Sequence, residues 1–314
     1  MFTYVNSPTA VGRYHVQLQR LPYTMNPAVA FVELLLIFII WLANVILIYI
    51  ICRRKSPRKI YEGSPPLAFV LLVTVLLAFA YMFMLIPWIA FSLGSTNTPL
   101  LVKATYVLGI TMVSTRFLYD LATLALFVQR IFILLFPTRC TKLVSLALNF
   151  TAFGIYVGVT VGLFAGYVVV YIYDTSPIPE GCFSFLCLVQ DKYSKFYTVT
   201  IRFALSISIV LCGSIFLILF SRKPFLQTKT LEAKFYVIMR CCFYLRIFLE
   251  IIPFALEFSL AKTMDISLAH YLGPHGGVGN AVDALLCTLL YYRVIAPPRH
   301  VVGSSTTYMS QTRH

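Results

Sequence analysis

The sequence predicts an all-α membrane protein, a seven-transmembrane helix bundle with its N-terminus outside the cell and its C-terminus in the cytoplasm. Of the 314 residues, 60% are hydrophobic and 11% are charged, which leaves too little polar surface to cover a water-soluble globule. Apolar runs long enough to cross a bilayer recur seven times. Basic residues are concentrated in alternate connections between these runs.

The apolar runs define an expected transmembrane domain, residues 28–295, between an extracellular segment (1–27) and a cytoplasmic tail (296–314). The first segment lacks the apolar core and cleavage-like site of a removable signal peptide, so the first run is expected to act as a signal anchor. Pro274 and four nearby glycines are expected to weaken or kink the outer half of the last run. The runs cover residues 28–51, 67–93, 104–136, 143–173, 197–220, 235–260 and 266–294.

The distribution of basic residues predicts the orientation. With the N-terminus outside, the cytoplasmic connections and tail hold 14 Lys and Arg residues, and the outside segments hold 6. This excess is the pattern expected of cytoplasmic loops. A net charge of +14 suggests a nucleic-acid partner in a soluble protein, but here the basic residues occupy short gaps between apolar runs. Contact with anionic membrane lipids explains them, and no nucleic-acid partner is expected.

Two of the eight cysteines, Cys182 and Cys187, lie in a segment predicted to be outside the cell. Oxidation there can join them across a small loop. A disulfide and two free thiols remain alternatives for this pair.

The third run carries charged residues, although it is apolar enough to lie in a bilayer. Arg116, Asp120, Thr123, Phe127 and Arg130 follow one another at steps of 4, 3, 4 and 3, which places them on one helical face. A charge in hydrocarbon is costly unless it is paired or faces a cavity. This face is therefore expected to lie against other helices.

The sixth run repeats the pattern, because Arg246, Glu250, Pro253 and Glu257 fall at steps of 4, 3 and 4. Its charges are therefore also expected to share one face.

The charged faces of the third and sixth runs are predicted to meet, because their charges lie at similar distances from the inner ends of the runs. At about 1.5 Å per residue, Asp120 and Glu250 both lie about 22 Å from the inner ends of their runs. Arg116 is then expected to reach Glu250 or Glu257, and Asp120 to reach Arg246. Asp120, Arg246 and Glu250 would form a switch network whose pairing differs between states. The alternative is local pairing at i,i+4, of Arg116 with Asp120 and of Arg246 with Glu250.

A ligand site is expected in the outer half of the bundle, beneath the long connection 174–196. For Arg202 and His270, contact with headgroups or loop residues is the alternative. The polar or adaptable residues expected to line the site are Met112, Arg116, Arg202, Glu257, His270 and Tyr271.

The chain resembles the rhodopsin-like G-protein-coupled receptors at a small number of positions. These are Asn44–Val45 in the first run, Arg130 with Pro137 seven residues later, and Pro253 in the sixth run. Short connections, aromatic-rich runs, Gln129 before Arg130 and a Ser/Thr tail resemble more narrowly the nematode serpentine chemosensory receptors. This resemblance implies a receptor, without enzyme activity or cofactor, in the plasma membrane, including that of sensory cilia. It also implies a small-molecule ligand and a heterotrimeric G protein as partners.

Coupling to the G protein is expected at the cytoplasmic face. The residues expected to carry it are Arg130, from the resemblance, and Arg222 and Lys223 in the basic connection 221–234. The alternative for Arg130 is a boundary arginine that reaches lipid phosphates.

The sequence also departs from the family pattern. Gln129 replaces an acidic residue, which puts the usual inactive-state lock in doubt, and no cysteine begins the third run. Ile251 stands where the family has an aromatic residue, and Asp283 is followed by Ala284 rather than proline. The second run lacks the family's aspartate.

Other seven-span classes fit less well. A retinal protein needs a lysine in the seventh run, which has none, and only His270 and His275 lie in a run, too few for a zinc hydrolase. Tyr119–Asp120 and the Gly-Val-Gly of 277–279 are similar to aspartyl-protease motifs, but Asn280 replaces the second carboxylate. A small-solute transporter is the main alternative, since intramembrane charges also mark substrate and proton paths. No internal repeat supports it.

Overall fold

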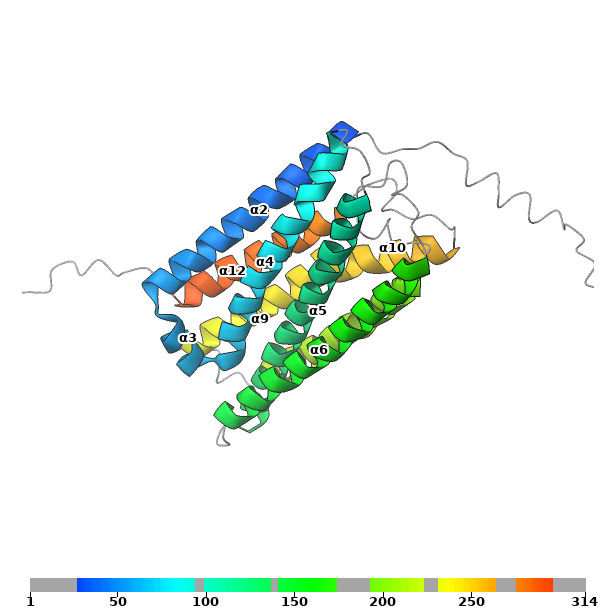
Figure 1. Cartoon of the computed structure of the whole chain (residues 1–314). Helices are drawn as coiled ribbons and strands as arrows, with labels where there is room; N and C mark the ends of the chain where they lie inside the picture. Colours follow the sequence, from blue (N-terminus) through cyan, green and yellow to red (C-terminus); the bar gives the residue numbers. More distant parts are fainter. Residues whose placement is uncertain are drawn as a thin grey trace, which may run out of the picture.

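The computed structural model describes residues 27–93, 99–136, 141–173, 193–222, 231–263 and 275–295, and all elements in these ranges are helical (Figure 1). In chain order they are α2 (Pro27–Arg54), α3 (Pro57–Gly63), α4 (Pro65–Ser92), α5 (Pro99–Leu135), α6 (Thr141–Tyr173), α8 (Tyr193–Ser221), α9 (Leu231–Arg246), the π-helix η2 (Ile247–Ile251), α10 (Ile252–Thr263) and α12 (His275–Ile295).

Six of these helices, α2, α4, α5, α6, α8 and α12, are long and apolar enough to cross a membrane. The chain therefore has the build of an all-α, multi-pass membrane protein. The predicted run 235–260 is not one uninterrupted α-helix, because it is divided into α9, η2 and α10, with 16, 5 and 12 residues. The short α3 was not among the predicted elements.

The π-helical turn is explained by Pro253. Proline has no N–H to donate to the carbonyl of Leu249, four residues earlier, and its ring crowds that carbonyl. Widening the turn relieves this conflict, and the N–H of Ile252 bonds to the carbonyl of Ile247, five residues before it. The spacing of the sixth run placed Pro253 on its charged face but did not predict the π-turn.

The glycines of the last run do not end its helix within the described residues. Gly276, Gly277 and Gly279 lie inside α12. A Cβ atom at Gly279 would lie 2.7 Å from the Leu249 carbonyl oxygen, and one at Gly277 would lie 3.0 Å from Cδ1 of Ile37. These glycines therefore allow α12 to approach η2 and α2 closely. Residues 264–274, where the seventh run was expected to begin, lie outside the described ranges.

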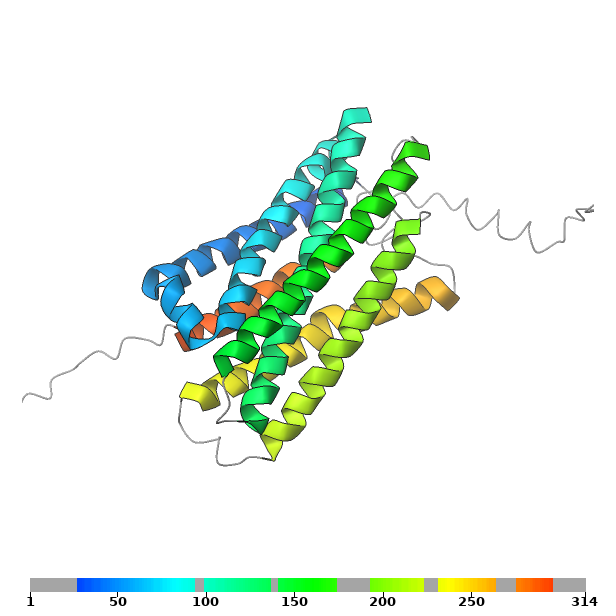
Figure 2. The same ribbon diagram turned by 60° about the horizontal axis from the view of Figure 1, so that its bottom comes forward.

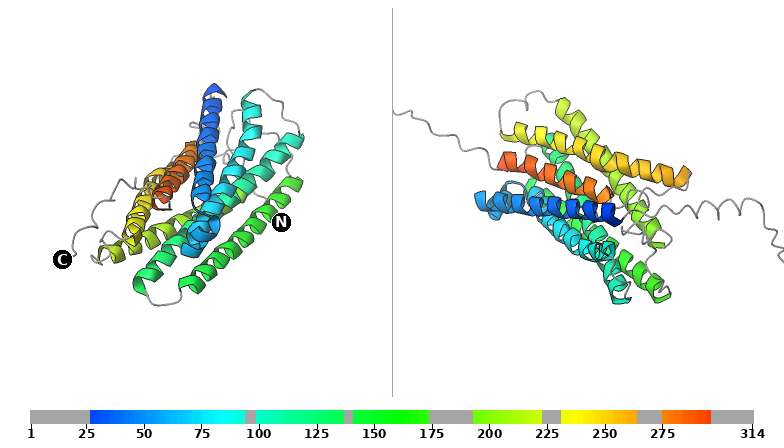
Figure 3. Two further views of the ribbon diagram at one scale, coloured as in Figure 1. Left: turned by 90° about the vertical axis from the view of Figure 1, so that its left-hand side faces the viewer. Right: turned by 90° about the horizontal axis from the view of Figure 1, so that it is seen from above.

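The helices form a bundle around α4 and α5 (Figures 2 and 3). α5 packs against α4, α6 and α8, whereas α2 packs against α4 and α12, and α12 also packs against α9 and η2. α5 consequently has neighbours on several sides, and its middle residues are almost all buried. A charge in the middle of α5 therefore faces other helices and not the bundle surface.

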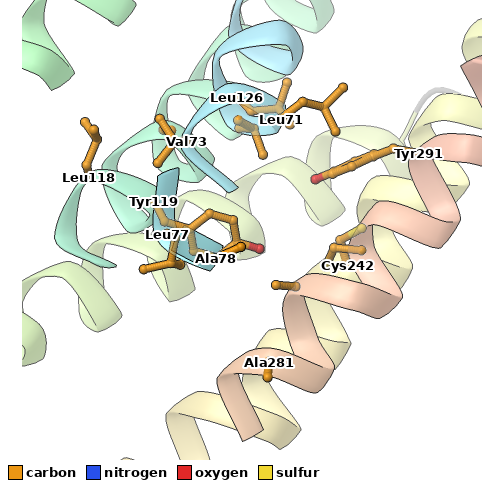
Figure 4. Packing of buried hydrophobic residues seen from close by; sticks show 14 of the residues in the cluster. Leu71, Val73, Leu77, Ala78, Leu118, Tyr119, Leu126, Cys242, Ala281 and Tyr291 are labelled. Carbon is orange, nitrogen blue, oxygen red and sulfur yellow. The ribbon is translucent and has the colours of Figure 1, made fainter. Parts of the chain in front are cut away.

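The apolar core lies between these helices (Figure 4), where side chains of α4, α5 and α12 approach one another. The Phe127 ring packs edge-on against Phe216 of α8 and Phe243 of α9, with centroid distances of 5.9 Å and 6.0 Å. Large aliphatic and aromatic side chains also cover the outside of the bundle, as at Phe150, which is 68% exposed. An apolar exterior around an interior that contains charges is the arrangement expected in a bilayer.

Candidate functional site

Five charged side chains are buried together in the bundle. We call them the charged cluster: Arg116 and Asp120 of α5, Arg246 of α9, Glu250 of η2 and Asp283 of α12. Asp120 and Arg246 are each 2% exposed, and Asp283 is 1% exposed. Charges buried this deeply are tolerated when they are paired.

Two ion pairs of the cluster join α5 to the α9–η2 segment. Nη2 of Arg116 lies 2.6 Å from Oε1 of Glu250, and Nη2 of Arg246 lies 3.0 Å from Oδ1 of Asp120. These are the contacts between the third and sixth runs that were predicted from the distances of the charged residues to the inner ends of their runs. Arg116 takes Glu250 as its partner, and not Glu257.

Arg246 is the centre of the cluster. Its Nε lies 3.3 Å from Oε2 of Glu250 and 3.7 Å from Oδ2 of Asp283, and its guanidinium covers the Tyr119 ring at 4.6 Å from the centroid. With Asp120, three carboxylates from three helical elements surround this one cation. The local pairing considered as an alternative is thus present for Arg246 and Glu250, in addition to the cross-helix contacts. Among the described contacts, Arg116 forms no such pair with Asp120.

Glu250 links the two arginines because its carboxylate uses one oxygen for each. It lies in the π-turn that Pro253 induces, beside the close approach of α12 at Gly279. A wide turn changes the direction of the side chains that follow it. The local backbone therefore helps to place Glu250 between the two guanidinium groups.

The charges of the cluster do not balance. Within the ion pairs of the cluster, two guanidinium groups face three carboxylates, an excess of one negative charge if all are ionised. The Arg202 guanidinium forms none of these pairs but interacts electrostatically with Asp120 and Glu250. Oδ1 of Asp120 and Oδ2 of Asp283 make no well-aligned hydrogen bond, so their contacts with Arg246 are chiefly coulombic. Asp283 has the longest contact and is the least firmly held carboxylate. In the described residues, no group of His, Cys, Asp or Glu is arranged to hold a metal ion.

The other residues predicted to bind ligand are not gathered into one described pocket. Met112 and Glu257 are half-buried. Arg202 is also half-buried, and its guanidinium stacks over the Phe254 ring at 4.2 Å from the centroid. His270 and Tyr271 lie outside the described residues, as do the disulfide candidates Cys182 and Cys187.

A second polar group lies near the end of α5 that is predicted to be cytoplasmic. We call it the Gln129 cluster: Ser64, Gln129, Arg130, Ser145 and Phe235. Ser64 donates a 3.3 Å hydrogen bond to Oε1 of Gln129, whose Nε2 donates a 2.7 Å bond to Ser145. Arg130 donates a 3.2 Å bond to Ser64 and stacks over the Phe235 ring of α9 at 3.9 Å. Gln129, noted above only as a departure, thus joins α5 to α6 and to the start of α4.

The remaining coupling candidates lie on the connection after α8. Arg222 is exposed at the end of the described segment, and Lys223 lies outside it.

Asp283 is the site residue that the sequence reasoning missed. Its signal was visible as the single carboxylate of the last apolar run. Its distance from the start of the seventh helix was not predictable, because that start was uncertain among Pro274 and the glycines around it.

No protein-family model matches the chain, and no curated protein is significantly similar to it. The resemblance described above therefore remains a prediction, and any functional proposal depends on the geometry of the two clusters.

Proposed function

We propose that the chain is a chemosensory G-protein-coupled receptor that binds a small molecule in the outer half of its bundle and signals through its cytoplasmic face. The observation that supports this proposal most strongly is the pair of ion pairs between α5 and the α9–η2 segment. A movement of one segment relative to the other must break or exchange these pairs. The charged cluster is therefore suited to hold one of two alternative arrangements.

In this proposal the ligand acts on the cluster through Arg116 and Glu250. A polar ligand group that competes for Arg116 releases Glu250, which retains Arg246 as its partner. Glu250 belongs to the irregular turn next to Pro253, so its release lets α9 change direction relative to α5. To change the ratio of the two arrangements tenfold, the ligand must bind one of them about 1.4 kcal/mol more tightly than the other.

At the other end of α5, the same movement changes the contact between Arg130 and Phe235. Separation of α9 from α5 takes the Phe235 ring away from the Arg130 guanidinium, which keeps its hydrogen bond with Ser64 and presents the uncovered face to the G protein. The basic connection after α8, including Arg222 and Lys223, then completes the proposed surface for a heterotrimeric G protein.

The topology proposed for the receptor has seven spans, the sixth being α9, η2 and α10, with the N-terminus outside. It rests on the 14 to 6 distribution of basic residues and on the continuous helical course from Leu231 to Thr263. The proposed location is the plasma membrane, including that of sensory cilia.

The unbalanced charge of the cluster favours a second candidate, a proton-coupled transporter of small solutes. An extra carboxylate among buried ion pairs is a chemically reasonable place to load a proton. In this candidate, Asp283 takes up and releases the proton because its contact with Arg246 is the longest.

The experiment that tests the receptor is expression of the full chain in cells with a promiscuous G protein and a calcium reporter, screened with small odorants. A response that wild type gives, and that Arg130→Ala abolishes without loss of surface expression or ligand binding, is the expected result. Unchanged signalling in Arg130→Ala would contradict the proposed coupling role. Solute uptake driven by a pH gradient, without any reporter response, would favour the transporter instead.

A further inference from the structure

An apolar groove lies on the bundle surface between α8 and the η2–α10 segment. Its volume is about 280 Å³, near the lower end of the range for small-molecule sites. Phe203 and Ile207 of α8 form one wall, and Ile251, Phe254 and Phe258 form the other. Phe203 and Ile207 are both exposed, so the groove opens onto the face that would contact lipid tails.

The groove exists because α8 contacts the opposite segment closely at two places. Towards the α9 side, the ring of Phe243 lies directly against Gly213, where no side chain separates them. Towards the end of α10, the rings of Phe203 and Phe258 stack with centroids 5.9 Å apart. Between these contacts, the groove is lined by Ser206 and Val210 of α8 and by Ile251 at the end of the π-turn.

A cation that forms no ion pair within the described ranges borders this groove. Arg202 lies one turn before Ser206, a groove residue, and its guanidinium covers the Phe254 ring. Unlike Arg116 and Arg246, it forms no ion pair with any residue of the described ranges, and its buried Nε has no hydrogen-bond partner. Arg116, Glu250, Glu257 and Asp120 interact with it electrostatically, and none of the three carboxylates forms an ion pair with it.

We propose that this groove binds a fatty acid from the bilayer, with the acyl chain between α8 and α10 and the carboxylate on Arg202. A guanidinium only donates hydrogen bonds, so its partner must be an acceptor, and a carboxylate matches it in charge and shape. The apolar walls and the opening towards lipid suit the hydrocarbon chain. The bound acyl chain contacts Ile251 in the π-turn that also holds Glu250, and so restrains the turn at which α9 is proposed to change direction.

The test is photolabelling of the full-length protein in phosphatidylcholine nanodiscs with a diazirine analogue of palmitic acid, followed by peptide mapping. Labelling is expected to concentrate on residues 203–211 and 251–259 and to be competed by palmitic acid but not by methyl palmitate. Labelling spread evenly over all lipid-facing helices would overturn the proposal, as would equal competition by the methyl ester. The test does not depend on the proposed function, because labelling measures occupancy directly.

Substitutions separate the acyl-chain part of the site from its charge. Ile207→Trp fills the groove and should remove the localised labelling, whereas Ile218→Trp, on the same helix and 52% exposed against 43%, should not. Arg202→Gln should weaken palmitate competition about tenfold or more, the loss expected for a charge-assisted hydrogen bond. Glu257→Gln should strengthen it, because a repelling charge is removed.

Equal competition in wild type and Arg202→Gln would overturn the assignment of the carboxylate site. Size-exclusion profiles and melting temperatures identify any variant that fails to fold. In that case, the wild-type competition between palmitic acid and its methyl ester decides the question alone.

Discussion

The charged cluster and the Gln129 cluster both join α5 to α9, but with different chemistry. The first uses full charges that are buried and, by count, not balanced. The second uses hydrogen bonds of an amide and two hydroxyls, with a single guanidinium on an aromatic ring. Breaking a buried ion pair strands a charge, whereas parting Arg130 from Phe235 breaks a cation–π contact. The charged cluster is therefore suited to determine how α9 lies against α5, and the Gln129 cluster to change when α9 moves.

The largest effect is expected for Arg246→Met, which removes the central cation. Asp120 and Asp283 then lose their only described ion-pair partner, and the folded state should lose about 3–5 kcal/mol. Thermal unfolding of the purified protein and its surface expression measure this loss. Arg240→Met is the matched control, because Arg240 is exposed on the same helix. Equal melting temperatures for the two variants would show that the cluster contributes little to stability.

A smaller effect is expected from the backbone that supports the cluster. In Gly279→Ala, the new methyl group meets the Leu249 carbonyl oxygen, and overpacking of this kind costs about 1–3 kcal/mol. Gly276→Ala is the control, because nothing lies within 4 Å of a Cβ atom there and alanine is the better helix former. Melting temperatures should therefore change in opposite directions. A change of the same sign and size in both would contradict the close packing of α12 on η2.

The Gln129 cluster should respond more weakly. Phe235→Leu removes the aromatic face under Arg130, and loss of a cation–π contact costs about 0.5–2 kcal/mol. If the chain acts as the proposed receptor and this cluster changes when α9 moves relative to α5, basal reporter activity should rise while ligand binding remains. Phe150→Leu, at an exposed position of α6, serves as the control. A stability loss as large as that of Arg246→Met would remove the distinction between the two clusters.

The smallest effect is expected for Asp283→Asn. The substitution removes the excess negative charge, while Asp120 and Glu250 still neutralise both arginines. Its stability should change by less than about 1 kcal/mol, in contrast to Asp120→Asn, which removes a 3.0 Å ion pair. Comparison of the two melting temperatures tests the charge count. A large loss of stability in Asp283→Asn would mean that the fold needs a carboxylate at Asp283.

The two clusters also differ in how far they were predictable. Asp120, Arg246 and Glu250 lie on long apolar runs with clear helical spacing, so their faces and approximate heights followed from periodicity alone. The role of Gln129 was not predictable, because its partners Ser64 and Ser145 lie at helix starts where neither period nor height is defined. The π-turn was missed because proline signals a disturbed helix without specifying its form.

Sharing of Arg246 among three carboxylates has a consequence for mutational history. The effects of replacing Asp120, Glu250 and Asp283 cannot be independent, because each loss changes how strongly the arginine is needed by the remaining two. The first carboxylate to disappear from a lineage is best tolerated if it is the surplus one, and after that loss the other two become harder to replace. The arginine itself can be exchanged safely only after Asp120 and Asp283 have gone, because Glu250 keeps Arg116 as a partner. Substitutions in this part of the chain are thus expected to accumulate in a preferred order.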